Sequence, residues 1–425
     1  MLNGLAREIA LAGLKRLTDG RLRVLTPGGA FECGTPTDLD AEVTVHDDRF
    51  FRRVVTRADI GLGEAYMDGD WTTPDLVAVC RVLLRNRAAF EGRLSWSAVA
   101  SEAIGAVARR LRDNSIAGSR RHIHHHYDLG NEFFQLFLDS ELRMYSCGYF
   151  RSGHDSLEAA QTEKVDRACR LLNLGPDDHL LEIGSGWGGL AAWAATRYGC
   201  RVTTTTVSEE QYRYVRDWKA SAGAAGDRVE VLKTDYRQLT GQFDKAISIE
   251  MFEAVGLRHY DDYFGAVDRL LKPGGSMLLQ TITVSDQWFP RYQGSPDWIE
   301  KYIFPGGELA SMGEVQKSLA RCTSLSLYSA ENFGTHYART LREWRTRFFA
   351  RIDDVRALGF DDRFIRMWEF YLASCEAAFL ERHCGLYQAL LVKNGSRTRQ
   401  FNEPWGVEQM VSAGTSRPGL TEPVA

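Results

Sequence analysis

Paired cysteines are absent from this 425-residue chain. Its eight cysteines are scattered, and no two of them stand in a C-x-x-C spacing. The sequence therefore disfavours a disulfide framework and the usual zinc-binding patterns. Reduced thiols of this kind are typical of a cytoplasmic protein.

Long apolar runs are missing as well. No stretch approaches the roughly 20 residues that a membrane-spanning helix needs. Residues 1–17 predict an amphipathic helix with basic side chains, but they lack the continuous apolar run and the cleavage site of a signal peptide. The net charge is −4, so no general attraction to nucleic acid is expected.

The first part of the chain predicts a small α+β unit. A Gly/Ser break with a histidine-rich run follows it near residue 118. We therefore expect an N-terminal domain over 1–118, a second, larger domain over 119–394 and a loosely ordered tail over 395–425. Two strands and two helices are predicted in the N-terminal domain, at 22–29, 41–47, 72–86 and 97–114.

From about residue 158, buried strands alternate with helical segments. Five strands are predicted at 179–183, 201–207, 229–235, 243–250 and 276–284, and two more that could close the sheet at 324–330 and 385–393. Strands alternating with helices favour right-handed β-α-β crossovers. The predicted fold class is α/β, a Rossmann-like unit with a mostly parallel seven-stranded sheet.

The stretch LLEIGSGWGGL, at 180–190, predicts a strand, a glycine-rich turn and a helix. Gly184, Gly186 and Gly189 fit G-x-G-x-x-G, in which glycines allow a tight turn and close approach of a ligand to the backbone. That motif alone suits NAD as well as S-adenosylmethionine.

Three neighbouring features favour S-adenosylmethionine. Glu182 ends the strand, where its carboxylate suits the amino group of the methionine part. Asp235 and Tyr236 follow a later strand, where they suit adenine. The second strand ends at Thr206 without the acid that a dinucleotide enzyme would use to bind ribose. An NAD-dependent oxidoreductase is therefore the less favoured alternative.

Several longer motifs are spread over residues 61–393. They include HYDLGNEFFQLFLD (126–139), MYSCGYF (144–150), EMFEAVG (250–256) and HYARTLREW (336–344). Together with LEIGSGWGG, they resemble the cyclopropane-fatty-acyl-phospholipid synthases and the related mycolic acid cyclopropane synthases. The resemblance implies transfer of a one-carbon unit from S-adenosylmethionine to the cis double bond of a phospholipid acyl chain, forming a cyclopropane. A fatty-acyl methyltransferase that makes a 10-methylene or methyl branch is the alternative.

The resemblance also assigns site residues. Cofactor contacts are implied for Tyr145, Ser146, Gly184, Gly186, Thr206, Gln211, Tyr236 and Arg237. A bicarbonate ion is implied beside Cys147, Glu253, Ile282 and Tyr337. The usual histidine of that ion site is replaced by Gln280, which can hydrogen-bond an anion but cannot carry a proton charge.

The implied chemistry leaves a carbocation on the acyl chain, and bicarbonate is expected to remove a proton from it. Glu253 would orient the ion and Tyr337 would donate a hydrogen bond to it. Cys147 is expected to help through backbone groups and not as a nucleophile, and its alternative is a buried apolar thiol. Glu250 and Glu253 are close neighbours, and we assign the role to Glu253 on the family motif.

Two polar clusters lie around the predicted domain boundary. His122, His124, His125 and His126 lack the spacing of a metal site, so no metal is expected. A basic cluster, Arg109, Arg110, Arg112, Arg120 and Arg121, fits either anionic lipid or an ordinary helix end. We expect a homodimer that contacts the inner face of the cell membrane. Aromatic residues that could line a lipid tunnel are Tyr127, Tyr149, Phe150, Tyr302 and Phe304.

Overall fold

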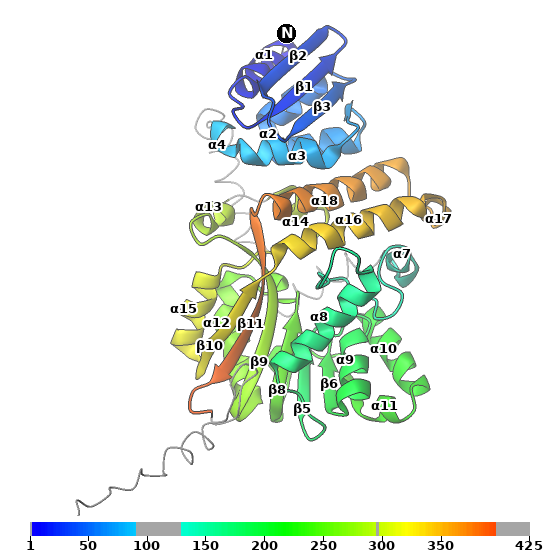
Figure 1. Cartoon of the computed structure of the whole chain (residues 1–425), viewed down its shortest axis with the longest axis vertical. Helices are drawn as coiled ribbons and strands as arrows, with labels where there is room; N and C mark the ends of the chain where they lie inside the picture. The colour runs from blue at the N-terminus through cyan, green and yellow to red at the C-terminus, as the bar shows by residue number, and fades with distance from the viewer. Residues whose placement is uncertain (1, 91–128, 295–296, 397–425) are drawn as a thin grey trace, which may run out of the picture.

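The computed structural model describes residues 2–90, 129–294 and 297–396, and it places a small N-terminal unit above a larger α/β unit (Figure 1). The predicted boundary near residue 118 lies outside these residues, so the division into domains stays a prediction. The predicted helix at 97–114, the histidine run, the arginine cluster and Tyr127 also lie outside them.

The N-terminal unit is built on a four-stranded sheet in the order β2-β1-β3-β4. Its strands are β1 (Gly20–Thr26), β2 (Gly29–Thr35), β3 (Asp40–Val45) and β4 (Trp71–Thr72). Its helices are α1 (Leu2–Leu14), α2 (Arg49–Met67), α3 (Leu76–Arg85) and α4 (Arg87–Phe90). Alternate residues of β1 and β3 are buried, as expected of a sheet with one covered face.

Several features of this unit differ from the sequence-based expectation, and strands β2 and β4 are among those that were not predicted. Helix α3 begins at Leu76, because Asp75 accepts a hydrogen bond from the Ala78 N–H and caps the first turn, while Thr72 belongs to a strand. Helix α2 was not predicted, and it carries a glycine at a tight contact. A Cβ on Gly63 would lie 2.4 Å from Nε1 of Trp298, so this glycine lets α2 pack closely against the catalytic unit.

The catalytic unit contains a seven-stranded sheet in the order β10-β11-β9-β8-β5-β6-β7. The strands are β5 (His179–Ile183), β6 (Arg201–Thr205), β7 (Val229–Leu232), β8 (Phe243–Ile249), β9 (Leu271–Val284), β10 (Leu325–Asn332) and β11 (Cys384–Lys393). The first five strands run parallel. β11 pairs with β9 antiparallel, and β10 pairs with β11 antiparallel, so β10 runs in the same direction as the first five. The predicted fold class is confirmed.

Helices cover both faces of this sheet. The described helices of this unit are α7 (Asn131–Gln135), α8 (Leu157–Leu171), α9 (Gly189–Trp193), α10 (Glu209–Ser221), α11 (Ala224–Asp227), α12 (Tyr260–Leu270), α13 (Phe289–Gly294), α14 (Trp298–Tyr302), α15 (Met312–Cys322), α16 (Gly334–Ala350), α17 (Ile352–Ala357) and α18 (Asp362–Leu380). Leu180 and Leu278 pack with α8 and α9, whereas Leu181 and Leu279 pack with α12 and α15. Consecutive strand residues point to opposite faces, which explains the two separate cores.

Helices α16 and α18 lie between the two units (Figure 1). α16 packs against β11, while α18 contacts α2 and α3 of the N-terminal unit. Their aromatic side chains join one large core that includes Phe51, Trp71, Trp344 and Trp368. The N-terminal unit is therefore packed directly on the catalytic unit.

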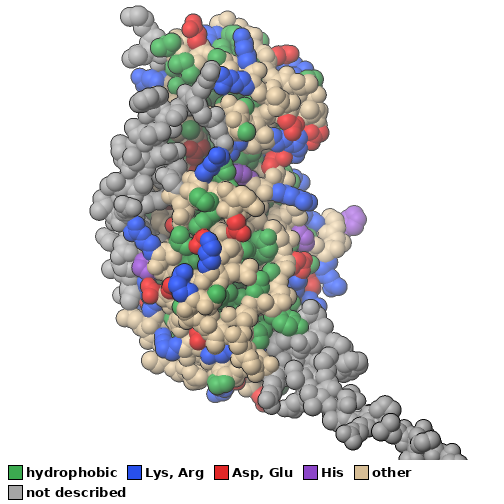
Figure 2. Space-filling model, turned by 90° about the vertical axis from the view of Figure 1, so that its left-hand side faces the viewer, with side chains coloured by type: hydrophobic (Ala, Val, Ile, Leu, Met, Phe, Trp, Pro, Cys, Tyr) green, Lys and Arg blue, Asp and Glu red, His purple; other side chains and the backbone are tan. Residues whose placement is uncertain are grey.

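No helix within the described ranges combines the length and the apolar character needed to cross a bilayer. On the face shown in Figure 2, basic and acidic side chains of the described residues are intermixed.

Candidate active site

A large cavity opens at the carboxyl ends of the parallel strands. Its volume is about 1750 Å³, and its lining extends from the ends of β5, β6 and β8 to α2, α3 and α18. The strand order reverses between β5 and β8, and ligands of doubly wound sheets bind at such a switch point. The topology therefore brings the glycine loop after β5 beside the acidic residues after β8.

All ten residues predicted to bind the cofactor line one end of this cavity, which we call the donor end. They are Tyr145, Ser146, Glu182, Gly184, Gly186, Thr206, Gln211, Asp235, Tyr236 and Arg237. Gly184 has φ +100° and Gly186 has φ +49°, in the left-handed region that favours glycine. A Cβ on Gly186 would meet no atom within 4 Å, so open space lies beside this part of the backbone.

Glu182 provides a buried carboxyl group at the donor end. Its Oε2 has no hydrogen-bond partner among the residues that the structure describes. Burial raises the pKa of this carboxyl to about 8. An unpaired buried carboxyl lining a cavity suits a ligand ammonium, as S-adenosylmethionine carries, because the cation would supply the missing partner.

The groups expected near adenosine are held by local hydrogen bonds. Asp235 pairs with the Arg237 guanidinium at 2.8 Å and also accepts the Arg237 N–H. Thr206 donates to Oε1 of Gln211 at 2.8 Å. These contacts fix the side chains in place before any ligand binds.

A loop over residues 140–150 covers the donor end. The Asp139 carboxylate accepts the backbone N–H groups of Leu142, Arg143 and Met144, which holds the loop in its turn. The Tyr145 hydroxyl lies 3.0 Å from the Tyr371 hydroxyl on α18. The loop is therefore fixed both internally and to the helix that contacts the N-terminal unit.

Lys164 lies beneath this loop, and sequence reasoning did not single it out. It is completely buried on α8, and its Nζ donates to Oγ of Ser146 at 2.7 Å. Burial lowers its pKa to about 8, against the attraction of Glu250 and other acids. A buried lysine is unusual in a helix, but nothing in its sequence neighbourhood distinguishes it from a surface lysine.

Glu250, directly after β8, is the centre of the polar cluster beside the donor end. Its carboxylate accepts hydrogen bonds from three groups: the Cys147 N–H at 3.0 Å, Nε2 of Gln280 at 2.7 Å and the Tyr337 hydroxyl at 2.6 Å. These donors are three of the residues predicted to hold bicarbonate. The structure thus brings them together, but around Glu250 and not around Glu253.

Glu253 faces a different set of donors, in the 3-10 turn Phe252–Ala254. Its Oε1 accepts the Ile282 N–H at 2.5 Å and the Thr281 hydroxyl at 3.0 Å. Its Oε2 is buried, and within the described part of the chain it has no hydrogen-bond partner. Burial, together with the negative charge of Glu250, raises the pKa of Glu253 to about 7.

Cys147 and Gln280 lie behind the cavity wall, whereas Glu253, Ile282 and Tyr337 line it. The Cys147 thiol is fully buried, and burial followed by the charge of Glu250 raises its pKa well above the ordinary value. A protonated thiol is a weak nucleophile. Its backbone N–H, by contrast, makes a defined contact with Glu250.

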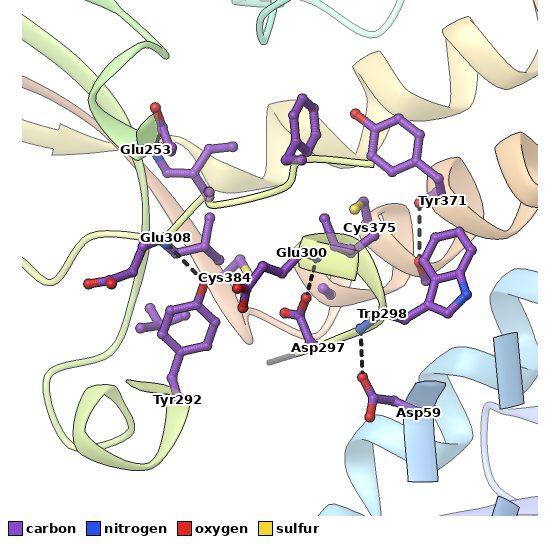
Figure 3. A pocket seen from close by; sticks show the side chains of 18 of the residues that line it. Asp59, Glu253, Tyr292, Asp297, Trp298, Glu300, Glu308, Tyr371, Cys375 and Cys384 are labelled. Carbon is purple, nitrogen blue, oxygen red and sulfur yellow. Dashed lines mark hydrogen bonds between the residues drawn. The ribbon is translucent and has the colours of Figure 1, made fainter. Parts of the chain in front are cut away.

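The other end of the cavity, which we call the apolar end, is walled mainly by hydrophobic side chains. They come from both units: Ile60, Leu62, Val79, Leu83, Ile282, Val284, Ile299, Phe304, Leu341, Phe370 and Phe379. In Figure 3, Glu253, Trp298 and Tyr371, from three separate segments, surround part of this space. Asp59 of α2 accepts the Trp298 N–H at 3.1 Å at its edge.

Three of the aromatic residues expected in a lipid tunnel do not line this cavity. Tyr149 donates to Glu331, Phe150 packs under Arg339 and Tyr302 donates to Glu64. Phe304 does line it. Single aromatic residues in a sequence rarely reveal which face of an element they will occupy, since packing decides this.

Comparison with known proteins agrees with this geometry. The sequence profile of the family described as "Mycolic acid cyclopropane synthetase" matches residues 115–389. The chain belongs to this family. The resemblance inferred from the motifs is thereby confirmed, and the protein is a member of a family of S-adenosylmethionine-dependent methyltransferases.

Two curated relatives of this family member cover most of the chain. It is 39% identical over 82% of its length to the tuberculostearic acid methyltransferase UfaA1 of Mycobacterium tuberculosis, of which 82% is covered. It is 37% identical over 84% of its length to the cyclopropane-fatty-acyl-phospholipid synthase of Escherichia coli K12, of which 90% is covered.

A solved structure supports the same placement. The mycolic acid cyclopropane synthase CmaA1, complexed with SAH and CTAB, matches with a TM-score of 0.59 and 30% identity. The match covers 64% of this chain and 98% of that one. Coclaurine N-methyltransferase, at 20% identity and a TM-score of 0.61, shares the fold.

Proposed function

We propose that this enzyme transfers the methyl carbon of S-adenosylmethionine to the cis double bond of an unsaturated phospholipid acyl chain and forms a cyclopropane. One observation carries the proposal: a single cavity joins the donor end, with its glycine turn and Glu182, to an apolar end walled by both units. An alkene has no charge or hydrogen-bonding group, so it must be held by apolar contact and aligned with the methyl donor.

The residues of the chain divide between two tasks. Glu182, Gly184 and Gly186 would hold the sulfonium donor, whose electrophilic methyl group supplies the carbon. The apolar end would exclude water from the carbocation that methyl transfer leaves, since water would capture it. Proton removal completes the reaction, and the sequence-based prediction gives this step to bicarbonate.

A second candidate product is a methylene or methyl branch. The relative UfaA1, named as a tuberculostearic acid methyltransferase, is 39% identical, and this observation favours the alternative. Both products require the same donor site and the same carbocation. They differ in the carbon that loses its proton: the new methyl group gives a ring, whereas a chain carbon gives a branch with a double bond.

The test is expression of the full chain in a bacterial host that makes unsaturated phospholipids, followed by mass spectrometry of the fatty acid methyl esters. A mass gain of one CH₂ with no remaining double bond at that site supports the cyclopropane. A gain of CH₂ with an olefinic branch supports the second candidate. Unchanged acyl chains would overturn the proposal.

Gly184→Val is the matched inactive control for that experiment. The backbone at position 184 has φ +100°, a conformation that is strained for valine. Even the Cβ of the new side chain would lie 3.1 Å from Met251. It should abolish product without touching the apolar end.

We further propose that the enzyme reaches its lipid by peripheral contact with an anionic membrane surface, using the basic cluster at 109–121. Flotation of the purified protein with vesicles containing anionic lipid tests this. Binding should weaken with salt, because the screening length falls from about 8 Å at about 0.15 M to about 3 Å at about 1 M. Salt-insensitive flotation, or none, would contradict this mode of contact.

A further inference from the structure

The polar cluster after β8 already contains a carboxyl group of the chain at its centre, that of Glu250. We propose that the carboxylate of Glu250 is the base that removes the proton from the substrate carbocation, in place of a bound bicarbonate ion. This inference rests on the proposed function, because it concerns the step that follows methyl transfer in the same cavity.

The hydrogen bonds carry the inference. Three of the groups expected to hold the ion are the Cys147 N–H, Nε2 of Gln280 and the Tyr337 hydroxyl, and all three donate to Glu250. The backbone N–H and the tyrosine hydroxyl each have a single hydrogen to donate. Glu250 already takes both, and a carboxylate has the same planar O–C–O group as bicarbonate.

Gln280 is well suited to a carboxylate partner. Its Oε1 accepts a hydrogen bond from Nε2 of Gln388 at 2.8 Å, which leaves its own amide nitrogen directed at Glu250. Both glutamine side chains are buried. Gln280, which stands where the family has histidine, thus gives Glu250 an uncharged hydrogen-bond donor with a fixed orientation.

The backbone at Glu250 indicates a functional constraint. Its φ is +49°, in the left-handed region that a residue with a side chain adopts at an energetic cost. Such conformations persist where the surroundings fix them, and they gather at active sites. Here the conformation places the carboxylate among its three donors at the wall of the cavity.

The surroundings of Glu250 favour its ionised form more than those of Glu253 do. The buried Lys164 attracts the Glu250 charge, and the three donors stabilise it, although burial raises the pKa of Glu250. The charge of Glu250 in turn helps to raise the pKa of Glu253. Of the two acids, Glu250 therefore has the contacts that favour a carboxylate, which is the form that can accept a proton.

The step balances as follows. The alkene π electrons form a bond to the methyl carbon, the C–S bond breaks with its electrons on sulfur, and the other alkene carbon becomes cationic. A Glu250 oxygen then takes a proton from the transferred carbon, and the C–H electron pair closes the three-membered ring. The carboxylic acid releases its proton to solvent before the next turnover.

The first measurement uses the unaltered enzyme. Turnover on vesicles of unsaturated phospholipid is measured in buffer freed of carbon dioxide, with and without added bicarbonate. We expect the two rates to agree within about twofold, because the base belongs to the chain. A rate that collapses without bicarbonate and returns when the ion is added would overturn the proposal.

The second measurement uses two variants of Glu250. Glu250→Gln keeps the size of the side chain but cannot accept the proton, so turnover should fall by at least about 100-fold. Glu250→Gly relieves the left-handed conformation and opens the space between the three donors. Added bicarbonate should raise the turnover of the glycine variant by at least about tenfold. It should not raise the turnover of the glutamine variant.

Controls separate the role of Glu250 from folding and from the proposed function. Glu230→Gln, at an exposed position of β7, should keep unaltered turnover. Calorimetry should find S-adenosylmethionine binding in every variant, which shows an intact donor end. A Glu250→Gln enzyme that binds the donor and turns over normally overturns the base assignment alone. An unaltered enzyme that binds the donor and modifies no lipid overturns the proposed function as well.

Discussion

Glu182 and Cys147 show how burial changes the chemistry of single side chains in this site. In water a glutamate is charged and a cysteine is reactive through its thiolate. In the folded chain, raised pKa values favour the protonated carboxyl of Glu182 and the protonated thiol of Cys147. For Glu182 a cationic ligand can reverse this, because the side chain lines the cavity. For Cys147 no such ligand can reach the sulfur, because it lies behind the wall.

Glu182 should make donor binding depend on pH. Its pKa is about 8 in the folded protein, so below that pH the carboxyl is protonated and must lose its proton to pair with an ammonium. Affinity for S-adenosylmethionine should therefore rise, by up to about tenfold per unit, between about pH 6 and about pH 8. Calorimetry over this range measures the affinity and the proton released.

Glu182→Gln is the matched control, because it retains shape but cannot ionise. The variant should bind S-adenosylmethionine more weakly than the unaltered protein does. Its affinity should be nearly independent of pH between about pH 6 and about pH 8, even though the titratable groups of Lys164 and Glu253 are still present. The same pKa shift also has a consequence for stability. Since the pKa is raised from 4.5, the group stabilises the ligand-free fold less as pH rises from about 4.5 to about 8. If the affinity of the variant for S-adenosylmethionine depends on pH as steeply as that of the unaltered protein, the role of Glu182 in donor binding is contradicted.

The Cys147 thiol should resist alkylation. Its raised pKa and complete burial leave almost no accessible thiolate at about pH 8. Iodoacetamide should modify it at least about tenfold more slowly than the half-buried Cys322, as peptide mass spectrometry can follow. Modification of both at equal rates would show that the loop over 140–150 opens readily.

At the scale of elements, the glycine turn before α9 depends on its contact with the covering loop. A Cβ on Gly189 would lie 2.2 Å from the Leu142 carbonyl oxygen, far inside any allowed contact. Gly189→Ala should push the loop away from the donor end and weaken S-adenosylmethionine binding by at least about tenfold. Calorimetry measures this directly.

Gly265→Ala on α12 is the companion variant. A Cβ there would meet no atom within 4 Å. Because alanine favours a helix interior over glycine, the change should stabilise the fold by about 0.5–1 kcal/mol and leave donor binding unchanged. If both variants bind the donor normally, the close packing of loop and turn is not what shapes the site.

Elements with strong local patterns were predictable, and those with tertiary causes were not. Strand β5 matches its predicted range, because an apolar run ends at a glycine turn. The strand predicted at 276–284 begins earlier, at Leu271, because Leu271 already pairs with Phe243 of β8; the register then shifts at the Pro-Gly-Gly sequence, and pairing resumes at Ser276. Helix α2 escaped prediction because its two glycines, Gly61 and Gly63, weaken the helical pattern and serve packing.

At the scale of the whole molecule, the N-terminal unit forms part of the cavity wall. Leu83 of α3 lines the apolar end together with residues of α18. Leu83→Trp should fill part of this space and lower turnover on long acyl chains by about tenfold. Binding of S-adenosylmethionine should not change, because the donor end lies in the catalytic unit.

The readout is turnover on phospholipids that share a double-bond position but differ in tail length beyond it. The variant should lose activity on the long tails first. Equal loss on all tails, or no loss, would show that the acyl chain does not extend toward α3. The homodimer expected from the family resemblance also stays a prediction.

The sequence by itself determined the parallel sheet, the glycine turn and the residues of the donor end. These features follow from local patterns: apolar runs, glycines with positive φ and polar residues at strand ends. Only the tertiary structure decided which acid occupies the centre of the polar cluster. Glu250 and Glu253 are three positions apart, and the left-handed backbone of one and the 3-10 turn at the other aim them at different donors. Those donors come from distant segments, which only folding brings together.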